Sequence, residues 1–360
     1  MDISGNRGEW SEIYALFRLL GEGKVHAGDA MMNKMDIYYP IINIIREESS
    51  KYEYKPDTQR DIVVINEDGH EYARIPITRF LEESQNLLDE IKSAKGSSFS
   101  VPKSEAFMKE IGCSNLKAPS RSKADIHIVI HDLRTGMTPL LGFSIKSQLG
   151  SASTLLNPGQ STNIVYRIEG KQLTDEDITN INSIKGHLPR MQAITDMGCT
   201  LQYVDIPNET FKYNLQFLDT CMPLFIAECL IVDSDTTTND KISEVITKVA
   251  ERNPLKYTNN NKYTFYEHKM KVLLTAVALG MTPATEWLGR YDANGGYLVV
   301  RKDGEIVCYH FYNLNDIEDY LFHNTRFDRA SRTRYNFGSL YRGDNGETLI
   351  KLNLQIRFTK

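Results

Sequence analysis

The sequence predicts a mixed α/β fold in which a core sheet is flanked by helices. Alternating apolar and polar residues at 124–131 and 140–147 predict a β-hairpin near the middle of the chain. Apolar residues at three- and four-residue spacing over 9–20 predict an amphipathic helix. Two more hairpins are expected at 296–311 and 337–358, where turn residues separate apolar runs. The predicted architecture is therefore a core sheet with flanking helices and additional helical and β-hairpin elements.

The segments between these elements alternate between helix and strand patterns. Residues 36–46 are expected to form a second helix, and residues 164–168 a third core strand. Thr78 is expected to cap a helix that follows a hairpin at 61–77. Further helices are expected at residues 102–111, 188–197, 208–232, 240–252, 263–279 and 315–323, with a strand at 199–206.

Length and composition allow a sizeable core but leave the number of domains open. The chain has 360 residues, of which 41% are hydrophobic, and this is enough for one large domain or two. We divide it into residues 1–206, with the first helix and the central hairpin, and residues 207–360, with further helices and hairpins. One continuous domain is compatible with the same pattern.

The charge balance excludes a globally basic protein but not a protein with one basic face. The formal net charge is −5. Between residues 321 and 360, however, eight lysines and arginines stand against three acidic residues. An enzyme that acts on DNA needs a basic surface on one face rather than a basic total. DNA therefore stays among the possible partners.

Cysteine usage and hydropathy predict a cytoplasmic protein without a membrane partner. The five cysteines form no CxxC pair, which is typical of reduced thiols in the cytosol. No apolar run approaches the length of a membrane span, and Glu9 and Glu12 interrupt the first apolar stretch, which argues against a signal peptide.

The central hairpin brings an acidic and a basic residue together. When the chain turns at 132–136, Asp125 comes to lie opposite Ser144 or Lys146, and opposed residues have Cβ atoms roughly 5 Å apart. A carboxylate can hold Mg²⁺, the metal can activate water, and a nearby lysine can stabilise developing negative charge. The pair therefore fits half of a metal-dependent phosphodiesterase site, although a surface cross-strand ion pair is the commoner explanation of such a pattern.

The residues around this hairpin resemble a known family. Asp125 with Ser144, Ile145 and Lys146 is similar to the PD-(D/E)xK nuclease core, in the variant that has serine at the second acidic position. Longer segments resemble the HpaII-type restriction endonucleases. These segments are KADIHIVIHDLRTGMTPLLGFSIKSQLGS (123–151), TLLNPGQSTNIVYRI (154–168), GNRGEWSEIYALFRLL (5–20) and FGSLYRGDNGETLIKLNLQIRF (337–358). The resemblance covers both ends and the middle of the chain.

The resemblance implies a type II restriction endonuclease with a PD-(D/E)xK core sheet. Such an enzyme would use Mg²⁺ to hydrolyse both strands of double-stranded DNA, at CCGG, leaving 5′-phosphates and responding to cytosine methylation. A palindromic site suits a homodimer, and a cognate cytosine methyltransferase would complete the restriction-modification system. The resemblance implies that Asp125 binds the metal and that Ser144 lines the site. Lys146 would orient the attacking water or polarise the phosphate.

Ser144 stands where a carboxylate is usual, so the site needs a second acid from elsewhere. Glu12 is the first candidate, because the spacing around it is similar to that of the first-helix glutamate of this nuclease superfamily. Glu9 is the second candidate and Glu169 the third. Asp125 and Glu12 are therefore the expected metal ligands. The alternative is that Glu9 and Glu12 are solvated, as glutamates in a first helical turn usually are.

Two polar segments are expected to contact DNA. Asparagine and glutamine can read adenine or donate to phosphates, and arginine can read guanine. The alternatives are that the amides satisfy loop backbone groups and that the arginines clamp phosphates or form surface ion pairs. The expected DNA-binding residues are Asn157, Gln160, Thr162, Asn163, Arg326, Arg329, Arg332 and Arg334.

Other readings remain open at this point. His127 and His131 share the face of Asp125, but a histidine on a strand is more often structural than chemical. Tyr263, Phe265 and Tyr266 could stack on bases, although helical core is the commoner use of such residues. A structure-selective nuclease such as a junction resolvase, or a DNA-binding protein whose site was lost through serine at position 144, are the functional alternatives.

Overall fold

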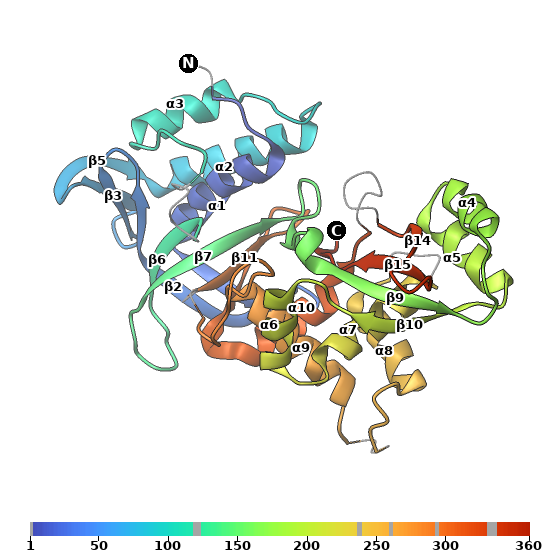
Figure 1. The fold of residues 1–360 in the computed structure, drawn as a ribbon. Coiled ribbons are helices and arrows are strands. Elements are labelled where there is room, and N and C mark those ends of the chain that lie inside the picture. The colour runs from blue at the N-terminus through green and yellow to red at the C-terminus, as the bar shows by residue number, and fades with distance from the viewer. Residues whose placement is uncertain (1–2, 118–123, 236–239, 259–261, 292–294, 330–336) are drawn as a thin grey trace. The chain divides into compact units, whose positions relative to one another are not determined.

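The computed structural model describes residues 3–117, 124–235, 240–258, 262–291, 295–329 and 337–360 (Figure 1). The chain divides into two compact units, each made of discontinuous segments. Unit 1 comprises residues 1–153, 293–320 and 360, and unit 2 comprises residues 154–292 and 321–359. The expected boundary at residue 206 falls inside unit 2, and the division into two domains at that residue stays a prediction.

Unit 1 is built on one large sheet with helices beside it. Its nine strands follow the order β1-β12-β11-β7-β6-β2-β3-β4-β5. The strands are β1 (Lys24–Gly28), β2 (Lys34–Glu47), β3 (Lys51–Asp57), β4 (Ile62–Glu67), β5 (His70–Pro76), β6 (Ile126–Ile130), β7 (Leu140–Ser147), β11 (Gly296–Val300) and β12 (Ile306–His310). The helices are α1 (Arg7–Glu22), α2 (Ile77–Ser93) and α3 (Pro102–Glu110), and a 3₁₀ turn covers Phe311–Asn313. Helices α1 and α2 lie side by side (Figure 1).

Unit 2 holds two smaller sheets and most of the helices. The strand orders are β10-β9-β15-β14 and β13-β16-β8. The strands are β8 (Thr154–Leu156), β9 (Asn163–Glu169), β10 (Thr200–Asp205), β13 (Thr325–Phe327), β14 (Leu340–Arg342), β15 (Thr348–Asn353) and β16 (Ile356–Phe358). The helices are α4 (Asp175–Ser183), α5 (His187–Asp196), α6 (Glu209–Leu218), α7 (Met222–Ser234), α8 (Ile242–Arg252) and α9 (Phe265–Ala278), with a 3₁₀ turn at Gln160–Thr162. Helix α10 (Leu314–Asn324) contains the boundary between the units.

The mixed α/β class is confirmed, with several sheets and ten α-helices among the described residues. The central hairpin is confirmed as β6 and β7, which pair antiparallel with Ile126 opposite Phe143 and Ile128 opposite Leu141. The first helix is confirmed as α1. Its N-cap Asn6 forms a capping box with Glu9, and Gly23 ends it in the left-handed conformation, with φ 63°.

Three expectations about the elements were wrong. Residues 36–46 form part of strand β2 rather than a helix, because their β-branched residues pair with β6 and β3 in the middle of the sheet. Thr78 does not cap α2, whose N-cap is Pro76 and carries no side-chain cap. Residues 164–168 form a strand, β9, but this strand belongs to a sheet of unit 2 and not to the sheet of the central hairpin.

No single helix in the described ranges is both long and apolar enough to span a membrane. Helices α6 and α7 reach that composition only when taken together, and a bend of 102° separates them.

Candidate active site

The hairpin register places Asp125 beside Ser144 at one end of the two central strands. The backbone N–H of Asp125 donates to the carbonyl of Phe143 at 2.9 Å, which continues the ladder one residue beyond β6. The carboxylate Oδ2 of Asp125 then accepts the backbone N–H of Ile145 at 2.6 Å and the hydroxyl of Ser144 at 3.1 Å. The carboxylate is therefore held in one orientation by the opposite strand.

Lys146 lies two residues further along β7, on the same face as Ser144. Its Nζ donates to the Ser144 hydroxyl at 3.4 Å and lies 5.2 Å from the centre of the Tyr297 ring. Burial lowers the pKa of Lys146, although the charges of Asp125 and Glu12 favour the ammonium form. Acid, hydroxyl and lysine thus form one continuous cluster.

Helix α1 brings Glu12 to this cluster. The hydroxyl of the preceding residue, Ser11, hydrogen-bonds the hydroxyl of Ser147 at the end of β7, at 2.7 Å. Burial, and then the negative charge of Asp125, raise the pKa of Glu12 to about 8. Its Oε2 is buried and has no hydrogen-bond partner. Nearby positive charges offset these two effects only in part, so the helix presents a carboxyl group that burial holds largely in its neutral form.

Glu9, one turn earlier on α1, is already engaged in other contacts. Its Oε2 accepts the backbone N–H of Asn6 at 2.7 Å in the capping box, and its Oε1 pairs with Lys117 Nζ at 2.5 Å. Partial burial alone would raise the pKa of Glu9, but the hydrogen bonds from Lys117 and Asn6 hold it below its usual value. Glu9 therefore positions Lys117 beside the cluster.

The donor set suits a hard cation that keeps most of its own water. Among the described residues, no three histidine, cysteine or acidic side chains come together as a metal cage. Two carboxyl groups, those of Asp125 and Glu12, do approach each other, and the charge of Asp125 helps to raise the pKa of Glu12. Mg²⁺ usually binds through one or two carboxylates with water and substrate phosphates completing its shell. The unpartnered Oε2 of Glu12 fits such an ion.

Comparison with known proteins connects this cluster to an enzyme class. The model of the HpaII restriction endonuclease family matches residues 6–358. The chain belongs to the HpaII restriction endonuclease family. It is 46% identical, over 360 residues and 99% of both chains, to a protein named type II restriction enzyme HpaII from Haemophilus parainfluenzae. No solved structure matches the chain. The resemblance drawn from the sequence is confirmed, and the chain is a type II restriction endonuclease of the HpaII family.

Four expected DNA-binding residues of this HpaII-family chain lie in one segment of unit 2, in two different environments. Asn157 and Gln160 are exposed beside the 3₁₀ turn. Thr162 and Asn163 are buried: Thr162 bonds to the backbone of Gly159, and Asn163 accepts the side-chain N–H of Asn353 at 2.8 Å. The buried pair thus braces the segment, and the exposed pair is the part that solvent reaches.

The structure describes two of the four arginines that are expected to contact DNA. Arg326 pairs with Asp328 at 3.1 Å. Arg329 donates to the carbonyl of Asp233 at 2.6 Å and lies 3.5 Å from its carboxylate. Arg332 and Arg334 lie outside the described residues.

Three other candidates lie on β9 and on or beside β6. Glu169 is on β9 of unit 2, where it is half-buried and paired with Arg167. His127 and His131 are half-buried on and beside β6.

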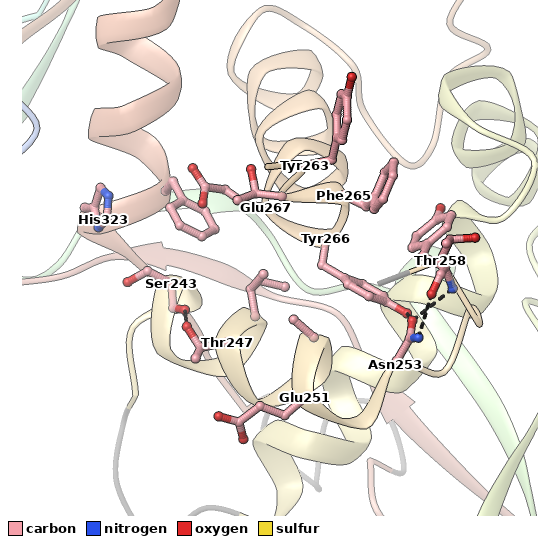
Figure 2. A pocket seen from close by; sticks show the side chains of 15 residues that line it. Ser243, Thr247, Glu251, Asn253, Thr258, Tyr263, Phe265, Tyr266, Glu267 and His323 are labelled. Carbon is pink, nitrogen blue, oxygen red and sulfur yellow. Dashed lines mark hydrogen bonds between the residues drawn. The ribbon is translucent and has the colours of Figure 1, made fainter. Parts of the chain in front are cut away.

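The aromatic residues near α9 divide into core and surface. Tyr266 is buried, whereas Tyr263 and Phe265 are exposed and stack with centroids 5.8 Å apart. They border a cavity of about 630 Å³ between α8, α9 and the end of α10 (Figure 2). Its polar lining includes Glu251 and His323.

Sequence reasoning missed Tyr297 and did not give Lys117 a place in the site. Tyr297 reaches the cluster through the pairing of β11 with β7, two strands about 150 residues apart in the chain. The glycine pair directly before Tyr297 is the one local signal of an unusually close strand.

Proposed function

We propose that this restriction endonuclease hydrolyses double-stranded DNA at CCGG in a Mg²⁺-dependent reaction, on a PD-(D/E)xK core formed by β6, β7 and α1. The observation that carries the proposal is the cluster of Asp125, Glu12 and Lys146, in which two carboxyl groups and a half-buried lysine converge at the end of the central hairpin. CCGG is proposed from the family resemblance rather than from the geometry of the site.

In the proposed mechanism, Asp125 and Glu12 hold the metal. Bound Mg²⁺ supplies a more acidic water and neutralises charge on the phosphate. Glu12 takes the place of the carboxylate that Ser144 does not provide, and it must lose its proton to do so, because burial favours its neutral form. Asp125 is held ready by the backbone N–H of Ile145.

The remaining residues act on water and phosphate. Lys146 orients the attacking water and stabilises the negative charge that develops on the phosphoryl oxygens. The Ser144 hydroxyl lies between Lys146 Nζ and the Asp125 carboxylate and fixes their spacing. Lys117, held by Glu9, adds a positive charge near the same carboxylates, where it favours the approach of a phosphate.

Recognition is proposed to come from unit 2. Asn157 and Gln160 are the exposed amides that can reach base edges, and the arginines of residues 326–334 supply contacts to guanine or phosphate. Thr162 and Asn163 then act by holding this segment in shape. The cluster of Asp125, Glu12 and Lys146 provides a site for one strand, so cleavage of both strands of a palindrome suits a homodimer. A cytosine methyltransferase that protects the same site is the proposed partner in the cell.

Digestion of unmethylated phage DNA with Mg²⁺ tests the proposal, with Asp125→Ala as the inactive control. Discrete fragments ending at CCGG, from the wild type only, are expected. Fragments that end at another sequence would refute the specificity and keep the reaction. Cleavage restricted to branched DNA would indicate a structure-selective nuclease, and DNA binding without cleavage under any divalent metal would indicate a dead site.

A further inference from the structure

The Tyr297 ring lies against the lysine of the proposed active site. Strand β11 runs parallel to β7, with Tyr297 paired with Ser144 and Val299 paired with Lys146. The Nζ of Lys146 is 5.2 Å from the centre of the Tyr297 ring. An ammonium group within about 6 Å of a ring centre is attracted by the negative ring face. Tyr297 itself is only 5% exposed, so little water competes for this contact.

Two glycines allow this strand to come so close. A Cβ atom at Gly295 would collide with the backbone of Gly142 on β7. A Cβ at Gly296, whose φ is +148°, would collide with the carbonyl of Tyr309 on β12. Residue 297 is the first after this pair that carries a side chain. The Gly-Gly-Tyr sequence therefore inserts β11 tightly between its neighbours and sets the ring beside Ser144.

The position of Lys146 depends on more than its hydrogen bond. A lysine side chain has four rotatable bonds, and several contacts are needed to hold its ammonium group in one place. The hydrogen bond from Nζ to the Ser144 hydroxyl is long, at 3.4 Å. The ring closes one side of the ammonium group, while Asp125 and Glu12 attract it from another.

We infer that Tyr297 is a positioning residue, whose ring face holds the Lys146 ammonium group at the scissile phosphate. The inference rests on the proposed function, since it assigns Lys146 to phosphodiester hydrolysis. The ring acts through its electrons and shape.

Stepwise fluorination of the ring tests this role. Phenylalanine and its mono-, di- and trifluoro derivatives at position 297 keep the ring's shape while they withdraw charge from its face. Each fluorine is expected to lower the single-turnover cleavage rate by about threefold, or about 30-fold in total, which corresponds to about 2 kcal/mol. The affinity for duplex DNA measured without metal should stay constant. A rate that is the same across the series would overturn the inference.

Tyr309 offers a matched control. It is a buried tyrosine directly opposite Tyr297 on β12, and its ring stacks on Tyr320 rather than on a lysine. The same fluorinated series at position 309 should leave the cleavage rate unchanged. A graded loss at both positions would show that the rate reports general packing, and the inference would fail.

A thermodynamic cycle decides the point without any cleavage. Tyr297→Leu, Lys146→Met and the double variant are compared by their unfolding constants. We expect a coupling of about tenfold in the unfolding constant, since removal of either partner ends the same contact. Additive effects would overturn the inference. Absence of cleavage by the wild type would refute the proposed function and leave this cycle to decide the role of the ring.

Discussion

Replacing Glu12 by glutamine is expected to stabilise the metal-free protein while it abolishes cleavage. The pKa of Glu12 is raised from 4.5 to about 8 in the folded chain, by burial and by Asp125. A carboxyl group whose pKa is raised by folding stabilises the protein fully below pH 4.5, and this contribution is lost as the pH rises towards 8. At pH 8 the loss is about 4 kcal/mol, from about 1.36 kcal/mol for each unit of pKa.

Glutamine keeps the shape of the side chain and cannot ionise, so Glu12→Gln avoids this loss. Its free energy of unfolding should exceed that of the wild type by about 4 kcal/mol at pH 8 in EDTA, and the difference should vanish near pH 4.5. Cleavage should fall at least 100-fold, because a proposed metal ligand is lost.

Tryptophan fluorescence can follow the unfolding of unit 1 alone. The chain has two tryptophans. Trp10 is buried on α1, and Trp287 belongs to unit 2. Urea titrations are therefore carried out in a Trp287→Phe background, at several pH values, with and without Mg²⁺. Mg²⁺ should stabilise the parent protein in proportion to its binding and should leave Glu12→Gln unchanged.

Glu9→Gln is the matched control, one turn earlier on the same helix. Glutamine preserves the capping geometry but loses the ion pair with Lys117, so a small destabilisation of about 0.5–1 kcal/mol is expected. The two variants should thus shift stability in opposite directions. If Glu12→Gln is neutral or destabilising at pH 8 without metal, the raised pKa that burial and the charge of Asp125 give to Glu12 is refuted.

Three further predictions concern other residues. Lys146→Ala should reduce the single-turnover cleavage rate 100- to 1,000-fold and keep most of the affinity for DNA. Cleavage assays and gel shifts measure the two effects. A wild-type cleavage rate would refute the role of Lys146 in the site. Burial lowers the pKa of His310 to about 4, so its contribution to stability is complete above pH 6.5 and is lost as the pH falls towards 4. The free energy of unfolding should fall by about 2 kcal/mol by pH 5. His310→Asn keeps an acceptor for the Tyr312 N–H and should remove this pH dependence in urea titrations. An unchanged pH dependence would assign it to another group. Gln160→Ala should weaken discrimination for CCGG by about 1 kcal/mol in competition binding, because CCGG offers no adenine for a bidentate amide pair and leaves a single hydrogen bond to a guanine or cytosine edge. Equal weakening on all sequences would indicate a phosphate contact.

Local patterns in the sequence were sufficient for the elements that carry Asp125, Lys146 and Glu12. Alternation along 124–131 and 140–147 predicted the hairpin, and the turn between them set its register within two residues. Helical spacing and the glycine at position 23 gave α1. The acid and the lysine meet through contacts between neighbouring strands, which a sequence pattern can describe.

Short apolar runs were the first limit of this reasoning. Residues 36–46 place apolar side chains at helical spacing as well as in a continuous run, so periodicity alone does not separate helix from strand. The isoleucines at 41, 42, 44 and 45 favour a strand. Partners on both sides, β6 and β3 for residues 43–47, decide the outcome, and although β3 follows directly after β2, β6 is about 80 residues away in the sequence.

Long-range pairing was the second limit. The sequence indicates that residues 164–168 form a strand but not which sheet they join, and it gives no reason to place Tyr297 beside Lys146. The buried environment of Thr162 and Asn163 likewise depends on Asn353 and Gly159, which come together only when β9 pairs with β15. Side chains that look available in a polar segment can thus be occupied by the fold.

The order in which the ribosome delivers this chain has a consequence for its activity. Strands β11 and β12 complete the sheet of unit 1 and lie between β7 and β1. Strand β7 is synthesised about 150 residues before β11. A nascent chain that has not yet reached residue 310 therefore exposes the unpaired edge of β7, next to Lys146, and lacks the ring that covers it. The first half of the chain therefore does not form the complete site, and the enzyme can cut DNA only after β11 and β12 have been synthesised.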